Sequence, residues 1–338
     1  MQQRPLGRSG LSVSRLALGT MTWGRDTDPD DAAAQLKLFL DAGGTLLDTA
    51  DVYGDGAAET VIGTLVGPLV PRDELLIATK AGLGHSPHRR RDSSRGHLLR
   101  TLDASLRRLG TDYVDLWQLH GYDPYTPLEE TLAAVDHAVH TGRVRYVGVS
   151  NLAGWQTAQV ATWQRAFPGR TPIVATQVEY SLLERGIERE VLPAAAALGL
   201  GVLPWSPLGR GVLTGKYRNG RPLDSRAATD HLAPFVRTYL EPRSSSIVEA
   251  VVTAAAGLGV EPLEVALSWI RDRPGVAAPI LGARTAGQLQ GALLSNNLTL
   301  PPEIAHALDD VSAIGIGYPE REGLTGPGAG GPPAADAY

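Results

Sequence analysis

The feature that most constrains the fold of this 338-residue chain is a repeated alternation between short apolar runs and longer segments with helical spacing. The short runs have the length of buried strands, and the longer segments place apolar residues three and four positions apart. Eight such strand–helix units predict a closed parallel (β/α)8 barrel of the α/β class. The expected strands are 16–18, 45–48, 75–79, 114–119, 144–149, 173–177, 201–205 and 276–281, and the clearest helices are 31–42, 94–109, 128–141 and 188–198.

An open, doubly wound sheet would show the same alternation, but it usually carries a glycine fingerprint directly after its first strand. Here the first strand continues into Gly-Thr-Met-Thr-Trp-Gly (19–24), which does not match that fingerprint. We therefore expect one TIM-barrel domain over residues 1–314. Turn residues between two short extended pieces at 4–13 predict a β-hairpin that plugs the bottom of the barrel.

Two segments fall outside this alternation. Residues 209–243 are rich in Pro, Gly, Arg and Asp and lack periodicity, and they are too long for a passive connection, which indicates a functional loop or lid. Residues 315–338 are rich in Gly, Pro and Ala, and we expect this tail to be partly disordered.

Composition excludes several functional classes. A formal net charge of −5 with 43% hydrophobic residues argues against a nucleic-acid partner and favours a small-molecule substrate. Cysteine is absent, so any redox chemistry needs a bound cofactor. There is no apolar run of signal-peptide length at 1–20 and no run of the roughly 20 apolar residues that a membrane helix needs. We expect a cytoplasmic protein with no membrane partner, and its oligomeric state stays open.

Four polar residues lie at neighbouring strand ends, where a parallel barrel builds its active site. Asp48, Lys80 and His120 each end an apolar strand, and Tyr53 follows Asp48 closely enough to fold back over it. A nearby ammonium favours the phenolate and makes a tyrosine a better proton donor. Asp48 could hold Lys80, and His120 could orient a carbonyl oxygen. Each residue alone is as often structural, but together they favour a shared catalytic site.

This constellation resembles the aldo-keto reductase superfamily. Residues 44–54, Gly-Thr-Leu-Leu-Asp-Thr-Ala-Asp-Val-Tyr-Gly, are similar to that family's Asp/Tyr segment, and Lys80 and His120 stand where its catalytic Lys and His fall. The resemblance extends from the opening hairpin to about Leu308. It implies a (β/α)8 barrel, NADP(H)-dependent reduction of a carbonyl substrate, and Tyr53 as general acid.

The later strand ends suggest a nicotinamide site. Ser150 and Asn151 could bind a carboxamide, with Gln177 as a third contact, although this pair could instead cap the next helix. Trp205 could stack on the nicotinamide or simply be a core aromatic at the rim. The glycines that follow it, with Leu208 and Lys216, resemble the family's loop over the pyrophosphate.

After the last strand, small residues could let phosphate approach helix-terminal amides. Arg284 could grip a 2′-phosphate, or it could be an ordinary surface arginine. Gln288 resembles the family's adenine-contacting Gln, but Ala292 stands where an Asn commonly follows. The expected cofactor residues are Thr20, Ser150, Asn151, Gln177, Trp205, Ser206, Leu208, Gly211, Lys216, Gly282, Arg284 and Gln288.

Aromatic residues predict the walls of the substrate pocket. Trp23, Tyr53, His120 and Tyr122 are expected there, with Phe235 from the long loop. Such walls suit aryl aldehydes and also stack on sugar rings, so the sequence leaves the substrate open.

Two other functions remain to be weighed. Asp48, Asp51 and His120 could hold a divalent metal in a hydrolase or lyase, but there is no compact ligand pair and Lys80 would repel a cation. A non-catalytic NADP(H)-sensing regulatory subunit would need the cofactor residues without the proton donor. The presence of all four catalytic candidates favours the reductase, with no metal.

Overall fold

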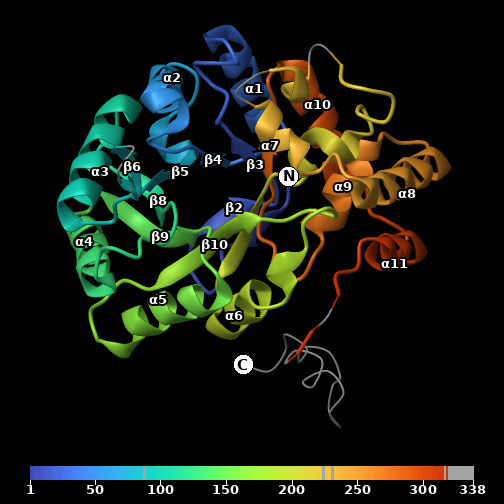
Figure 1. The fold of residues 1–338 in the computed structure, drawn as a ribbon. Helices are drawn as coiled ribbons and strands as arrows, with labels where there is room; N and C mark the ends of the chain where they lie inside the picture. The colour runs from blue at the N-terminus through green and yellow to red at the C-terminus, as the bar shows by residue number, and fades with distance from the viewer. Residues whose placement is uncertain (87–88, 223–224, 230–231, 316, 319–338) are drawn as a thin grey trace.

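Eight parallel strands form one sheet in the computed structural model, which describes residues 1–86, 89–222, 225–229, 232–315 and 317–318. Their order in the sheet follows the chain, so each strand–helix unit lies beside the next (Figure 1). The (β/α)8 prediction is confirmed. In sheet order the strands are β11 (Gly201–Trp205), β10 (Ile173–Glu179), β9 (Val144–Ser150), β8 (Val114–Leu119), β5 (Leu76–Ala81), β4 (Leu46–Asp48), β3 (Ala17–Gly19) and β12 (Ile280–Gly282).

The barrel is nearly closed at a seam between β11 and β12. One parallel bridge joins Val202 to Val276; the Val202 N–H donates to Gly275 O at 3.0 Å and the Ala277 N–H to Val202 O at 2.9 Å. The expected eighth strand at 276–281 is therefore too long. Pro279 has no N–H to continue a ladder, and regular pairing begins only after it.

Helices surround the sheet on its outer side (Figure 1). All four helices expected from spacing are present, and their boundaries follow local chemistry. The side chain of Asp28 caps the first of them by accepting the Asp31 N–H at 2.8 Å. The helices are α1 (Pro29–Asp41), α2 (Ala57–Leu65), α3 (Arg95–Leu109), α4 (Leu128–His140), α5 (Gly154–Ala166), α6 (Val191–Leu198), α7 (Ala233–Arg237), α8 (Pro242–Leu258), α9 (Pro262–Arg271), α10 (Ala286–Leu294) and α11 (Pro302–Val311).

An antiparallel hairpin of β1 (Gln3–Pro5) and β2 (Ser12–Ser14) covers the N-terminal end of the barrel, as expected. Its buried Leu6, Leu11 and Val13 join a core cluster with interior residues of the strands. Gly7 allows this close approach, because a Cβ there would lie 2.5 Å from the Gly199 carbonyl oxygen. A second hairpin, β6 (Leu83–Ser86) with β7 (Arg89–Arg91), was not expected from the sequence.

The long segment at 209–243 is not irregular throughout. It contains 3₁₀ helices at Gly209–Thr214 and Arg226–Ala228, then α7 and the start of α8. Its residues 223, 224, 230 and 231 lie outside the described residues, as do residues 316 and 319–338 of the tail whose disorder was expected.

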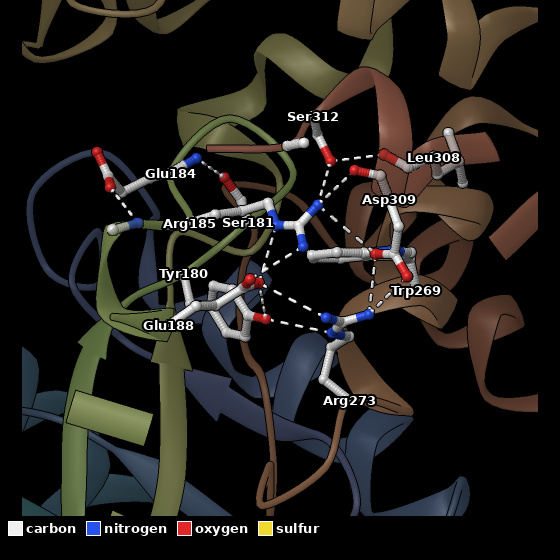
Figure 2. Close-up of polar contacts among 12 residues, drawn as sticks. Tyr180, Ser181, Glu184, Arg185, Glu188, Trp269, Arg273, Leu308, Asp309 and Ser312 are labelled. Carbon is white, nitrogen blue, oxygen red and sulfur yellow. Dashed lines mark hydrogen bonds and ion pairs between the residues drawn. The ribbon is translucent and has the colours of Figure 1, made fainter. Parts of the chain in front are cut away.

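Buried charges attach α11 to the loop after β10 (Figure 2). Arg185, whose side chain is 8% exposed, bonds Glu188 at 2.8 and 2.9 Å and donates to the Asp309 carbonyl oxygen at 2.8 Å. Arg273 binds the Asp309 carboxylate, and the Trp269 indole N–H donates to the same group at 3.0 Å. This network ties three distant parts of the chain together.

Among the described helices, none is alone long and apolar enough to cross a membrane. Helices α8 and α9 reach that length and composition only as a pair, bent by 102°.

Candidate active site

The four catalytic candidates converge at the C-terminal end of the barrel. Lys80, completely buried in β5, donates from Nζ to Asp48 Oδ2 at 2.8 Å and to the Thr49 carbonyl oxygen at 2.9 Å. The same Nζ lies 3.3 Å from Tyr53 Oη. The ring of His120 meets that of Tyr53 edge-on, with centroids 6.1 Å apart. Asp48, Lys80 and Tyr53 thus form one contact row with His120 beside it.

A tight turn after β4 places Tyr53 over this row. Gly54, Asp55 and Gly56 follow it with φ of 56°, 53° and 92°, three consecutive residues in the left-handed region. Two glycines make that turn accessible, because an L residue with a Cβ is strained there. At Gly56 a Cβ would also lie 2.7 Å from Arg108 Nε, so this position has no room for a side chain.

Burial governs ionisation in this row. It raises the pKa of Tyr53, and the charge of Lys80 only partly opposes that rise. Lys80 thus favours the phenolate as expected, but burial raises the pKa of Tyr53 by more than Lys80 lowers it. Burial alone would lower the pKa of Lys80, but Asp48 and Tyr53 raise it, so Lys80 stays an ammonium ion.

His120 is neutral at physiological pH. Burial, and then the positive charges of Lys80 and Arg91, lower its pKa well below the ordinary value. Its Nδ1 is buried and has no hydrogen-bond partner among the described residues. A neutral imidazole has one N–H donor, and His120 lines the cavity described next.

A cavity of about 530 Å³ opens above the row. Asp48, Tyr53 and His120 line its floor, and Lys80 reaches it through Tyr53. Every residue expected to bind the cofactor lines this cavity: Thr20, Ser150, Asn151, Gln177, Trp205, Ser206, Leu208, Gly211, Lys216, Gly282, Arg284 and Gln288.

One end of the cavity suits an amide group. Ser150 Oγ is buried in its wall and has no hydrogen-bond partner among the described residues. Asn151 is already engaged, since its Oδ1 accepts the Trp205 indole N–H at 2.9 Å and its Nδ2 donates to His120 O at 3.1 Å. Gln177 Nε2 donates to Asp48 Oδ1 at 2.7 Å. The alternative that Ser150 or Asn151 caps α5 is excluded, because Ala153 holds that position.

The other end suits phosphate. Lys216 and Arg284 bring two cations to the wall, and Gly211 lies between them and β11 in the sequence with φ of 93°, a backbone conformation that favours glycine. Gln288 Oε1 accepts the Arg284 N–H at 3.0 Å. Ala292 also lines the cavity, and its methyl group cannot form the hydrogen bond of an Asn at that position. An extended dinucleotide phosphate fits this donor set.

Two expected substrate contacts are corrected. Trp23 is completely buried and its Nε1 donates to Gln35 Oε1 at 3.3 Å, because the turn after β3 folds the indole into the core. Tyr122 packs edge-on against Trp155, with centroids 5.8 Å apart. Neither residue lines the cavity, whereas Phe235 does.

The sequence reasoning missed Arg210. Its guanidinium binds the Glu179 carboxylate at 2.9 and 2.7 Å, donates to the Phe235 carbonyl oxygen at 2.6 Å and lies 3.7 Å from the centre of that ring. This holds α7 at the cavity wall. Its one sequence signal is a charged residue between two glycines after β11. Ala283, expected with Gly282 near the phosphate, also lines the cavity, and lining residues that were not expected are Gly19, Met21, Thr22, Pro207, Thr214, Leu263, Ile280 and Leu281.

The described residues do not support the alternative of a metal-dependent hydrolase or lyase. In the described part of the chain, no three His, Asp or Glu side chains converge as metal ligands. Asp48, one of the residues weighed for that role, is bonded to the Lys80 ammonium.

A (β/α)8 barrel with Tyr, Lys, Asp and His at one end of a deep cavity defines a class of barrel oxidoreductases. The model of the Aldo/keto reductase family matches residues 15–313. The chain belongs to this family and is one of its oxidoreductases.

Curated relatives cover nearly the whole chain. An uncharacterized oxidoreductase of Bacillus subtilis, YrpG, is 38% identical over 92% of this chain and 96% of its own length. The L-glyceraldehyde 3-phosphate reductase of Escherichia coli K12 is 34% identical over 93% of each. A probable voltage-gated potassium channel subunit beta of rice is 34% identical over 95% and 98%.

Proposed function

We propose that this protein uses NADPH to reduce an aldehyde or ketone to the alcohol, with Tyr53 as the general acid. The observation that carries the proposal is the row in which Lys80 Nζ lies 2.8 Å from Asp48 and 3.3 Å from Tyr53 Oη at the floor of the cavity. When bound, NADPH would supply a hydride for the carbonyl carbon. Tyr53 would give its proton to the carbonyl oxygen.

The neighbours of Tyr53 make this proton transfer favourable. The neutral His120 would donate a hydrogen bond to the carbonyl oxygen and polarise it. The Lys80 ammonium would stabilise the phenolate that remains on Tyr53 after transfer, and Asp48 would keep Lys80 in place. Apolar lining residues, among them Leu208 and Leu263, would exclude water and strengthen these interactions.

The cofactor would lie along the cavity. Ser150 would bind the carboxamide, Trp205 would stack on the nicotinamide ring, and Lys216 and Arg284 would bind phosphate groups, with Gln288 near the adenine. The Arg284 guanidinium suits a 2′-phosphate, which makes NADPH the preferred form.

Replacing Tyr53 with Phe tests the proposal. NADPH binding, followed by tryptophan fluorescence, should stay nearly unchanged, while kcat for carbonyl reduction should fall by about 10² to 10⁴-fold. Tyr146→Phe is the control, because Tyr146 packs against the hairpin cluster at the other end of the barrel and should leave both unchanged. Retained turnover in Tyr53→Phe would remove Tyr53 as the proton donor.

A regulatory NADP(H)-sensing subunit is the second candidate, and the potassium channel subunit beta among the relatives favours it. Its signature would be tight NADPH binding without turnover across a panel of aldehydes, ketones and phosphorylated trioses. The triose belongs in the panel because one relative is an L-glyceraldehyde 3-phosphate reductase.

A further inference from the structure

A second carboxyl group lies close to the catalytic row. Asp51 is 2% exposed, and its backbone N–H donates to the carbonyl oxygen of Lys80 at 3.4 Å. It does not line the cavity and so cannot touch a substrate. It follows β4 by three residues and precedes Tyr53 by two, and it interacts with Lys80 of the row and with Glu59 and Arg108 of the outer helices.

An ion pair supports Asp51 from the far side. Glu59 in α2 is completely buried; it accepts the Thr79 hydroxyl at 2.5 Å and the Arg108 Nε at 2.8 Å. Thr79 directly precedes Lys80 in β5. Arg108 reaches this site from α3 across Gly56, the residue whose missing Cβ leaves space for the guanidinium. The pair therefore touches both the strand that carries Lys80 and the turn that carries Tyr53.

Asp51 interacts electrostatically with both groups. Burial, and then the negative charge of Glu59, raise the pKa of Asp51 to about 7, against the opposing charges of Arg108 and Lys80. The charge of Asp51 in turn raises the pKa of Tyr53. A change of one proton at Asp51 near neutral pH thus alters the potential at the proton donor.

We propose that Asp51 is a positioning residue whose charge, balanced by Glu59 and Arg108, sets the pH range over which Tyr53 keeps the proton that it donates. This rests on the proposed function for the role of Tyr53, but the electrostatic link does not depend on turnover. Above neutral pH Asp51 is ionised, and its negative charge disfavours the Tyr53 phenolate. Tyr53 therefore stays protonated further into the alkaline range than it would beside a neutral residue.

The charged and titratable groups that interact with Asp51 are Lys80 from β5, Glu59 from α2 and Arg108 from α3, with Tyr53 on its own turn. His120 does not titrate in the same range, because its pKa is far below the ordinary value. An inflection near neutral pH at Tyr53 would therefore report Asp51.

The first experiment observes Tyr53 directly in the full chain. Protein labelled with ¹³Cζ-tyrosine is titrated by NMR from acidic to alkaline pH, and Tyr53→Phe assigns the resonance. We expect an inflection near pH 7 in the Tyr53 resonance, which Asp51→Asn removes. Asp55→Asn is the matched control, because it neutralises an exposed carboxylate on the same turn and Asn tolerates its left-handed backbone. An inflection that persists in Asp51→Asn would overturn the proposal.

The second experiment measures the pH profile of kcat/KM with NADPH and 4-nitrobenzaldehyde. Loss of the Asp51 charge lowers the pKa of Tyr53, so Asp51→Asn should move the alkaline limb of the profile to lower pH. Arg108→Gln removes a positive charge that lowers the pKa of Asp51, so the inflection that Asp51 gives in the Tyr53 resonance should move to higher pH. If the alkaline limb of the Asp51→Asn profile coincides with that of the wild type, the inference is refuted, and the proposed reductase activity is unaffected. Absence of turnover in the wild type would refute the reductase, and the NMR result would still decide the inference.

Discussion

At the scale of single residues, the catalytic row shows how burial and a neighbouring charge compete. Tyr53 lies beside an ammonium ion, yet its pKa is raised, because surrounding side chains remove water from the phenol. Lys80 does not make Tyr53 a strong acid. It lowers the free energy of the phenolate that forms when Tyr53 loses its proton. In the proposed reaction, Tyr53 is therefore fully protonated at neutral pH and gives up its proton only when a carbonyl oxygen is becoming negative.

Arg284 offers a prediction at this scale. Arg284→Ala should weaken NADPH binding by about tenfold or more, the size of one charged hydrogen-bond interaction, and should leave NADH binding nearly unchanged. Titrations with both nucleotides measure the ratio. Arg25→Ala is the control, because Arg25 bonds the adjacent Asp26 and does not line the cavity. Equal weakening of both nucleotides would contradict a 2′-phosphate contact.

The sequence predicted polar residues at strand ends better than aromatic residues in loops. Asp48 and Lys80 end strands, and parallel pairing alone brings such ends together. Trp23 and Tyr122 also follow strands, but several residues of loop intervene. The direction in which a loop turns depends on packing partners such as Gln35 and Trp155, which lie far away in sequence.

At the scale of elements, α11 is attached by ion pairs as well as by apolar packing. Leu308 is buried, and Ile304 packs half-buried against the same core cluster. Arg273 binds the Asp309 carboxylate, and Arg185, which also binds Glu188, donates to the Asp309 carbonyl oxygen (Figure 2). Removing one charged partner of such a network leaves the charges of the other partners unpaired.

Arg185→Ala should therefore lower the free energy of unfolding by about 3 kcal/mol. Urea denaturation followed by circular dichroism measures it. Arg218→Ala removes an equally well-formed pair with Glu249, at 2.6 Å, but that pair is exposed and its loss should not be measurable. If the two variants unfold at the same urea concentration, the buried network is not what holds α11.

The largest shift of an expected strand boundary has its cause in a single residue. The apolar run at 276–281 has the composition of a strand, and Pro279 within it prevents regular pairing until Ile280. The short helices inside 209–243 were hidden because each spans too few residues to show a period.

At the scale of the whole molecule, the barrel is least continuous at the seam between β11 and β12. Val202 and Val276 form one bridge there, whereas β8 and β9 pair at five positions. Hydrogen–deuterium exchange should be faster for peptides that contain Val202 and Ala277 than for those of β8 and β9, because fewer hydrogen bonds must open. Equal exchange rates would mean that the barrel opens as one unit.

The cavity crosses this seam, with Trp205 on one side and Gly282 on the other. A nucleotide that contacts both residues would bridge the two strands where few hydrogen bonds join them. A ligand that binds only the folded protein adds its free energy of binding to the free energy of unfolding. A bound nucleotide would therefore stabilise the closed barrel. The resistance of the barrel to unfolding would then rise with the concentration of nucleotide around it.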